Sequence, residues 1–240
     1  MNGTTKYMQY LREKIFTDKA ELELKLAKEI STNLEQEIIN KGKATLLVSG
    51  GNTPKKLYEI LSSKDINWNN VSIGLIDERF VGTDSDQSNE FFIKKTLLKN
   101  KAADAKFIGL VYNINNYHEN LNIAISKNKP FYKSITCSIL GMGLDGHTAS
   151  LFPNSEEVYT DDSIYGDKMI INTRATSEPS NRISYTKAKI LSSKHLFLYF
   201  NGKEKLDVFN SAKETKNASI KPISAFIHQN IKTLNVFCSI

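Results

Sequence analysis

The sequence contains little cysteine, and its two cysteines do not suit a disulfide framework. Cys137 and Cys238 each lie in an apolar stretch typical of a strand, whereas disulfide-dependent secreted domains carry many cysteines in loops. We therefore expect both thiols to be reduced and buried. The C-x-x-C and H-E-x-x-H patterns of zinc sites are also missing, and the four histidines lack ligand spacing. No metal ion is expected.

Long apolar runs are absent as well. Nowhere do eighteen apolar residues follow one another, so the sequence predicts no transmembrane helix and no contact with a membrane. The first residues lead into mixed charge without the apolar segment of a secretory signal. We expect a cytoplasmic location.

Charge of one sign is not concentrated anywhere in the chain. The 240 residues carry a formal net charge of +6, but the lysines are scattered among glutamates, without a basic stripe interleaved with aromatic residues. This distribution argues against nucleic-acid binding. A small phosphorylated substrate and a lysine-rich solvated surface both account for the excess of positive charge.

The hydrophobic pattern that is present predicts an α/β fold. Apolar residues recur at every fourth position from Leu22 to Ile38, which indicates an amphipathic helix over residues 18–41. Further strands and helices alternate, with strands at 44–48, 71–76, 106–110, 134–140, 168–172, 196–200 and 233–238, and helices after 54, near 88, and at 117–126, 186–193 and 203–211. This order predicts one three-layer domain over residues 1–240, with a mainly parallel sheet and helices on both faces. Ligands of such sheets bind at the carboxyl ends of the strands.

A glycine pair directly follows the first of these strands. Residues 49–54 are Ser-Gly-Gly-Asn-Thr-Pro, in which Gly50 and Gly51 allow backbone N–H groups to approach an anion. The proline suits the first turn of a helix, whose free amides attract phosphate. The segment has no P-loop lysine, and Leu47 excludes a G-x-S-x-G nucleophile elbow around Ser49. It is either an anion-binding loop or a plain strand-to-helix turn.

Three charged residues follow the strand predicted at 71–76. They are Asp77, Glu78 and Arg79, and at least one should point into the crevice above the sheet. The planar guanidinium of Arg79 suits a phosphate or a developing oxyanion, or else a salt bridge with a neighbouring carboxylate. Farther along, Ser88 is typical of a helix cap.

The strand predicted at 134–140 runs into the most informative loop. Gly141, Gly143 and Gly146 interrupt the apolar pattern, and Asp145 and His147 come with them. An imidazole takes up a proton near neutral pH without special tuning, and a nearby carboxylate can orient it. The position of this histidine after a glycine-rich strand end therefore favours catalysis over a structural role.

The same glycines spell G-x-G-x-x-G, the pattern of a dinucleotide site, but their context is wrong for one. An acidic residue should end a second strand about twenty residues later, whereas Asp161 and Asp162 lie in polar loop sequence. A helix starting after the third glycine would also meet Pro153 within two turns. We reject a nicotinamide cofactor.

Five motifs resemble, in order and spacing, those of the 6-phosphogluconolactonase family, within the glucosamine-6-phosphate isomerase/6-phosphogluconolactonase superfamily. They are Ser49-Gly-Gly-Asn-Thr-Pro, Asp77-Glu-Arg with Ser88-Asn89, Leu140-Gly-Met-Gly-Leu-Asp-Gly-His-Thr-Ala-Ser-Leu-Phe-Pro, Asn181-Arg-Ile-Ser, and Gly202-Lys-Glu-Lys. The resemblance covers nearly the whole chain, and the central block is its most specific part. The related deaminases carry a glutamate where Phe152 stands, and a tyrosine where Arg79 stands. Both departures favour the lactonase.

The resemblance implies hydrolysis of 6-phospho-D-glucono-1,5-lactone to 6-phosphogluconate, in the oxidative pentose phosphate pathway. His147 would be the general base that activates water, and Asp145 would orient it or a sugar hydroxyl. Neither a cofactor nor a metal is implied, Ser150 would be structural or contact the substrate, and we expect a monomer. The expected substrate-binding residues are Gly50, Gly51, Asn52, Thr53, Asp77, Arg79, Asn89, Gly146, Arg182 and Lys205.

Two other functions stay open at this point. One is a deaminase-isomerase that acts on an amino-sugar phosphate, with Asp77 as the proton shuttle. The other is a non-catalytic sensor of sugar phosphates that has kept the pocket, although the intact loop around His147 argues against it.

Overall fold

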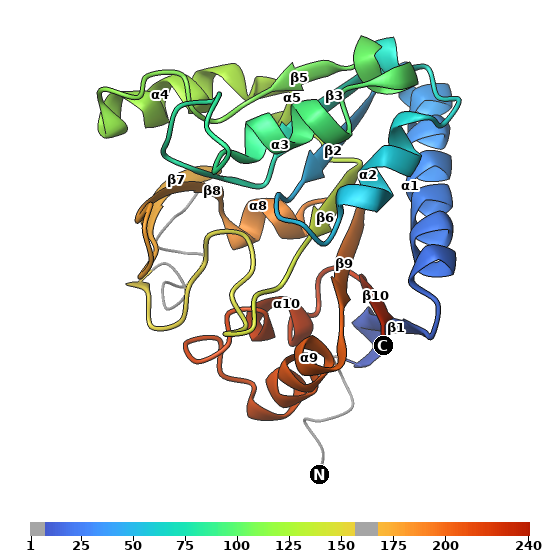
Figure 1. Ribbon diagram of the computed structural model, residues 1–240, viewed down its shortest axis with the longest axis vertical. Coiled ribbons are helices and arrows are strands. Elements are labelled where there is room, and N and C mark those ends of the chain that lie inside the picture. The colour runs from blue at the N-terminus through green and yellow to red at the C-terminus, as the bar shows by residue number, and fades with distance from the viewer. Residues whose placement is uncertain (1–7, 157–167) are drawn as a thin grey trace.

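A parallel sheet of seven strands runs through the molecule (Figure 1). The computed structural model describes residues 8–156 and 168–240. The strands follow the order β1-β10-β9-β6-β2-β3-β5, and every neighbouring pair is parallel. Their bounds are β1 (Leu11–Phe16), β2 (Ala44–Val48), β3 (Val71–Leu75), β5 (Lys106–Ile108), β6 (Cys137–Leu140), β9 (His195–Asn201) and β10 (Leu234–Ser239). The predicted α/β class is confirmed.

Helices cover both faces of this sheet, as two consecutive residues of β9 show. Side chains alternate between the faces of a strand, so Tyr199 and Phe200 point to opposite sides. The Tyr199 hydroxyl donates to Glu23 of α1 (Lys19–Lys41), at 2.8 Å. The ring of Phe200 instead packs on Phe209 of α9 (Lys203–Thr215), with centroids 5.4 Å apart. The helices α1 and α9 therefore belong to opposite outer layers.

The ends of α1 follow the rules of helix capping. The side chain of Asp18 accepts a hydrogen bond from the amide of Ala20, and Gly42 ends the helix in a left-handed conformation with φ of 73°. The other helices are α2 (Lys55–Ser62), α3 (Asn89–Thr96), α4 (Tyr117–Lys127), α5 (Lys129–Lys133), α8 (Lys187–Leu191) and α10 (Ser224–Ile227), with 3-10 turns η1 (Met8–Tyr10), η2 (Trp68–Asn70) and η3 (Asn100–Asp104). Within the described ranges, no helix has the length and apolar character needed to cross a bilayer.

A second, antiparallel sheet was not predicted. It has the order β4-β8-β7, with β4 (Asp77–Arg79), β7 (Ile170–Arg174) and β8 (Asn181–Tyr185). The predicted strand over 71–76 ends one residue early, and the chain then continues into β4. Residues 181–184, placed before a helix in the sequence analysis, form most of β8. The edge strand β1 was also missed, because its half-exposed pattern of alternating charges does not look like a buried strand.

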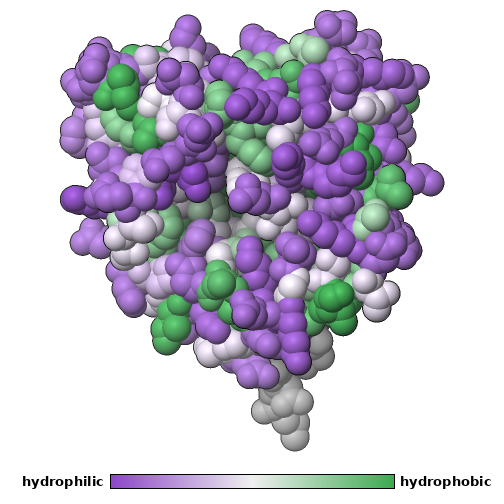
Figure 2. Space-filling model, viewed as in Figure 1, coloured by the Kyte–Doolittle hydropathy of each residue, from purple (hydrophilic) through white to green (hydrophobic). Residues whose placement is uncertain are grey.

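Figure 2 shows that hydrophilic residues cover most of the visible face, with apolar residues in small, separate patches. The apolar residues of the strands lie inside instead, and all five residues of β2 are buried. Because the seven strands are parallel, the loops that follow β2, β3, β6 and β9 all emerge at one edge of the sheet.

Candidate active site

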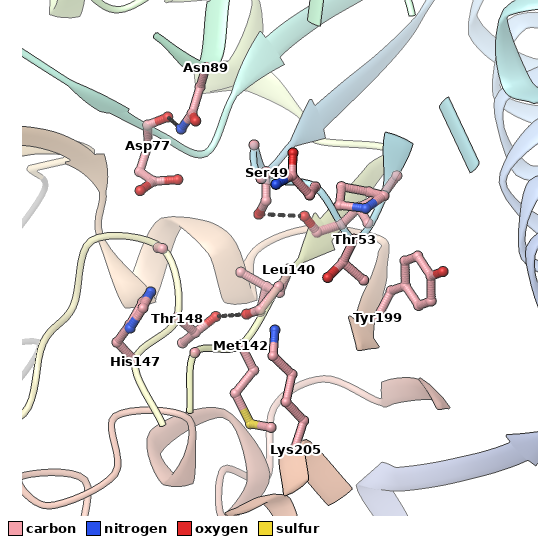
Figure 3. Close-up of a pocket in the computed structure, with 18 of the residues that line it drawn as sticks. Ser49, Thr53, Asp77, Asn89, Leu140, Met142, His147, Thr148, Tyr199 and Lys205 are labelled. Atoms are coloured by element: carbon pink, nitrogen blue, oxygen red, sulfur yellow. Dashed lines mark hydrogen bonds between the residues drawn. The ribbon is translucent and has the colours of Figure 1, made fainter. Parts of the chain in front are cut away.

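A cavity of about 240 Å³ lies at the carboxyl ends of these strands. Figure 3 shows that side chains from separate loops surround it, including His147, Asp77, Thr53 and Lys205. Nine of the predicted site residues line it: Gly50, Gly51, Asn52, Thr53, Asp77, Arg79, Asn89, His147 and Lys205. Asp145, Gly146 and Arg182 do not line it, although Asp145 and Gly146 belong to the loop that carries His147.

His147 and Asp145 form a hydrogen-bonded pair at the cavity. His147 Nδ1 lies 2.6 Å from Asp145 Oδ1, and the backbone amide of His147 donates to the same oxygen at 3.1 Å. Burial alone would raise the pKa of Asp145, but the hydrogen bonds and charge of His147 outweigh it and lower this pKa. An ionised carboxylate only accepts hydrogen bonds, so Nδ1 carries the proton and Nε2 keeps a free lone pair. These two hydrogen bonds fix the orientation of the imidazole ring at the cavity.

The glycines of this loop make room for that pair. A Cβ atom at Gly143 would lie 2.2 Å from His147 Nδ1 and 2.6 Å from Asp145 Oδ1, so any side chain there would force His147 and Asp145 to move. Gly146 has a φ of +82°, in the left-handed region that favours glycine. The loop is closed by the Gly143 amide, which donates to the His147 carbonyl at 2.9 Å, and by Thr148 Oγ1, which donates to the Gly141 carbonyl at 2.8 Å.

The predicted anion loop is anchored between β2 and α2. Ser49 Oγ donates to the Ile139 carbonyl at 2.8 Å, and the buried Tyr58 hydroxyl donates to the Ser49 carbonyl at 2.7 Å. Gly51 has a φ of +89°, and no side chain caps the N-terminus of α2. The loop therefore presents glycine backbone and an uncapped helix N-terminus to the cavity.

Asp77 and Asn89 form the wall of the cavity that adjoins this loop (Figure 3). Asn89 Nδ2 donates to the Asp77 carbonyl at 2.8 Å, and a Cβ atom at Gly50 would lie 1.9 Å from Asn89 Oδ1. Gly50 is thus required for the close approach of the two walls. The carboxylate of Asp77 accepts a hydrogen bond of 2.6 Å from Ser150, whose side chain is buried. Ser150 therefore has a partner within the protein, which fits the structural role, one of the two roles predicted for it.

Glu78, which the sequence analysis left without a role, holds this wall together. Its carboxylate is buried and accepts from the backbone amides of Arg79, Asn89 and Glu90 at 2.7–2.8 Å, and from the Ser88 hydroxyl at 2.9 Å. Burial raises its pKa to about 7, and these hydrogen bonds oppose the rise. The side chain joins β4 to the N-terminus of α3, where Ser88 is the cap, as predicted.

The two arginines lie differently. Arg79 lines the cavity, and its Nη1 donates to the Gln87 carbonyl at 2.6 Å. Arg182 stands opposite Arg79 in the β4–β8 pair, is buried, and does not line the cavity. Burial and the neighbouring Arg79 lower the pKa of Arg182. The structure thus separates two arginines that the sequence analysis treated alike.

Lys205 comes from the first turn of α9, which follows β9. In Figure 3 its amine points toward Leu140 and the interior of the cavity. Burial lowers its pKa, and it makes no ion pair with any residue of 8–156 or 168–240. Among the described residues, no carboxylate therefore neutralises the Lys205 amine.

Several lining residues were not predicted. Tyr58, Met142 and Tyr199 lie in apolar segments that were assigned to helix, loop and strand, so only the alternation of faces along β9 could have indicated Tyr199. Ala149 adopts a left-handed φ of 52°, which the sequence gives no reason to expect. Within the described parts of the chain, no cluster of three or more metal-binding side chains occurs.

Comparison with known proteins identifies the family of this chain. The family model for glucosamine-6-phosphate isomerases and 6-phosphogluconolactonase matches residues 17–235. The chain belongs to this family. Among curated members of the glucosamine-6-phosphate isomerase/6-phosphogluconolactonase family, it is similar to the 6-phosphogluconolactonases of Neisseria meningitidis serogroup A (34% identical, over 92% of this chain and 96% of that one) and Rhizobium meliloti (30%, over 93% and 96%).

A solved structure extends the comparison to three dimensions. The crystal structure of a 6-phosphogluconolactonase from Shewanella baltica superposes with a TM-score of 0.90 at 36% identity, over 96% of this chain and 98% of the other. The family resemblance stated from the motifs is confirmed.

Proposed function

We propose that this protein hydrolyses 6-phospho-D-glucono-1,5-lactone to 6-phospho-D-gluconate, the second step of the oxidative pentose phosphate pathway. The observation that carries the proposal is the His147–Asp145 pair, whose imidazole shares one cavity with the uncapped N-terminus of α2 and with Lys205, which has no ion-pair partner among the described residues. A base and a phosphate-binding wall are the two parts that this substrate requires. The family to which the chain belongs and its similarity to 6-phosphogluconolactonases support the same reaction.

In this mechanism His147 is the general base. Nε2 takes a proton from a water molecule while the water oxygen adds to the lactone carbonyl carbon. The tetrahedral intermediate then breaks its ring C–O bond, and the proton on Nε2 passes to the leaving hydroxyl. General base catalysis of this kind contributes about 10² to 10⁴ in rate. Asp145 keeps Nδ1 protonated and stabilises the imidazolium while it exists.

The phosphate would bind at the α2 side of the cavity. Backbone amides of Gly50 and Gly51, the N-terminus of α2 and the side chains of Asn52 and Thr53 offer hydrogen bonds there, and Lys205 offers a charge. Arg79 is then left for the negative charge that develops on the former carbonyl oxygen, because it lines the wall near Asp77 and Asn89. Fixed donors at such an oxygen contribute as much as the base.

A covalent acyl intermediate on Ser150 is not part of the proposal. Its hydroxyl is held by a hydrogen bond to the Asp77 carboxylate and its side chain is buried, so it lacks the exposure of a nucleophile. The deaminase alternative also loses support at this site. The ring of Phe152 lies 5.2 Å from that of His147, at the position where the deaminases carry their glutamate, and phenylalanine transfers no proton.

The test is to generate the lactone enzymatically and to follow 6-phosphogluconate with a coupled dehydrogenase. We expect hydrolysis well above the spontaneous rate, and no ammonia release from glucosamine-6-phosphate. Ammonia release without lactone turnover would select the deaminase. Binding of sugar phosphate without either reaction would select the non-catalytic sensor.

A further inference from the structure

A second concavity, of about 690 Å³, lies at the other end of the sheet. Lys194 directly precedes β9, and Lys232 lies two residues before β10. The concavity therefore opens at the amino ends of the strands, whereas the active-site cavity lies at their carboxyl ends. We refer to it as the amino-end groove. Its lining residues are Arg12, Lys14, Lys25, Lys28, Glu29, Thr32, Asn33, Lys194, His195, Phe197, Lys232, Thr233 and Asn235.

The fold itself assembles this groove. The parallel register places Arg12 of β1 beside Asn235 of β10, and Asn235 beside Phe197 of β9, so the three form one row on one sheet face. The opposite side comes from α1, where Lys25, Lys28 and Thr32 are spaced by three and four residues and share a helix face. The groove is the space between that helix face and the β1 edge of the sheet.

Positive charge dominates the groove. Six lysine and arginine side chains line it against a single carboxylate, Glu29, which pairs with Lys14. Lys194 is neutralised by Glu37 from outside the groove. For Arg12, Lys25, Lys28 and Lys232, the described residues contain no ion-pair partner. Like charges that line one concavity, without counter-ions among the described residues, repel one another, and a bound anion would relieve this repulsion.

His195 reports the same excess of positive charge. Burial lowers its pKa, and the neighbouring Lys232 and Lys194 lower it further, against the smaller opposite effect of Glu37. Its ring is therefore neutral at neutral pH and can donate or accept a hydrogen bond within the groove. Thr32, Asn33 and Asn235 add uncharged polar groups around it.

We propose that the amino-end groove binds a small anion carrying several consecutive phosphate groups, of the kind found in a nucleotide polyphosphate. Four cations without an ion-pair partner among the described residues come from β1, α1 and the segment before β10 and line one concave space, which suits a compact, multiply charged ligand. The groove is larger than the active-site cavity, so it accommodates more than a sugar phosphate.

Nucleic acid fits the groove less well. Single strands bind by stacking bases on exposed aromatic rings, and the one aromatic side chain that lines the groove, Phe197, is only 1% exposed. The cations also gather in one place instead of following a track along the surface. A surface that is merely rich in lysine would mix the two signs of charge, as the rest of this chain does.

The test uses the full-length protein and titration calorimetry with inorganic tripolyphosphate and with ATP, at low and at physiological salt. We expect both probes to bind, and the triple charge reversal R12E/K28E/K232E to weaken binding by about tenfold or more, with a shallower dependence on salt. Tighter binding of ATP would add recognition of its nucleoside to the phosphate chemistry. Equal binding of the two probes would support the phosphate chain alone as the ligand.

A matched control reverses three exposed lysines near the opposite edge strand, K106E/K127E/K129E, none of which lines the groove or the active-site cavity. We expect this variant to bind within about twofold of the wild type. Lys205→Ala should also retain binding, because it affects the active-site cavity alone. Equal losses in both triple variants would overturn the proposal, as would failure of the wild type to bind either probe. Binding of a single-stranded oligonucleotide without tripolyphosphate would likewise contradict it.

Discussion

At the scale of single residues, the site depends on two carboxylates with opposite environments. Asp145 is half exposed, and its pKa is lowered because His147 stabilises the charged form. Glu78 is buried, and its pKa is raised because burial outweighs four hydrogen bonds. The first orients the proposed base, whereas the second fixes the backbone from which Asp77, Arg79 and Asn89 reach the cavity.

This difference predicts the behaviour of Glu78→Gln. In the variant, the side-chain amide N–H groups would face backbone N–H donors that in the wild type donate to carboxylate oxygens. The free energy of unfolding should therefore fall by about 1–3 kcal/mol. A carboxyl with a raised folded pKa stabilises the folded state below its unfolded pKa of about 4.5, and this contribution is lost as the pH rises through about 7. The deficit of the variant should therefore shrink between pH 5 and pH 8, as measured by urea denaturation.

The control for this measurement is Glu59→Gln, which removes only surface ion pairs with Lys56 and Lys99. Its unfolding free energy should stay within about 0.5 kcal/mol of the wild type at each pH. A Glu78→Gln deficit that grew with pH would contradict the account of Glu78.

Most residues of the site could be predicted from the sequence, because each follows a strand end and carries suitable chemistry. His147, Asp77 and Lys205 were found in this way, and all three line the cavity. Glu78 was not assigned a role, since a charged residue at a strand end gives no sign of whether it points inward or outward. Arg79 and Arg182 could not be told apart for the same reason.

At the scale of elements, the loop after β6 works as a unit, and its glycines have different tasks. A side chain at Gly143 would collide with His147 and Asp145, whereas a Cβ atom at Gly141 would meet nothing within 4 Å. The G-x-G-x-x-G spelling therefore reflects the space that the His147–Asp145 pair needs, and not a pyrophosphate site.

The pair Gly143→Ala and Gly141→Ala tests this point within one loop. We expect Gly143→Ala to lower kcat by about 10² or more, because the base is displaced, with little change in melting temperature. Gly141→Ala should keep kcat within a few-fold, although it also lines the cavity. Equal effects of the two substitutions on kcat would show that the loop does not depend on this close approach.

Elements with a strong apolar period were predicted well, and short ones with polar residues were not. The sequence patterns that predict β2, β6 and α1 arise from burial: β2 and β6 are buried on both faces, and α1 is buried on one face. β4 has three residues, all charged, and becomes a strand only by pairing with β8, about a hundred residues later. Such long-range pairing leaves no periodic signal in either segment.

At the scale of the whole molecule, the parallel sheet separates two regions with different chemistry. Its carboxyl ends carry the loops of the proposed active site, and its amino ends carry the basic amino-end groove. The region at the carboxyl ends could be predicted from the sequence, because the residues of each loop are consecutive in the chain. The amino-end groove could not be predicted, because its lysines and its arginine come from four distant segments and meet only in the folded protein.

The two cysteines report on the integrity of this sheet. Both are fully buried, and burial raises the pKa of Cys137 well above its ordinary value and that of Cys238 to about 11. We expect neither thiol to react with a chromogenic disulfide in the native protein at pH 8, and both to react in denaturant. Rapid reaction of either thiol in the native protein would contradict the packing of β6 or β10.

The central claim is that His147 is the base of a sugar-phosphate lactonase, and the measurement that tests it most directly compares lactone hydrolysis by the wild type and by His147→Ala. We predict a kcat about 10² to 10⁴ lower for the variant, with binding of 6-phosphogluconate unchanged within a few-fold, because the phosphate-binding wall is intact. A variant that hydrolyses the lactone at nearly the wild-type rate would contradict the account.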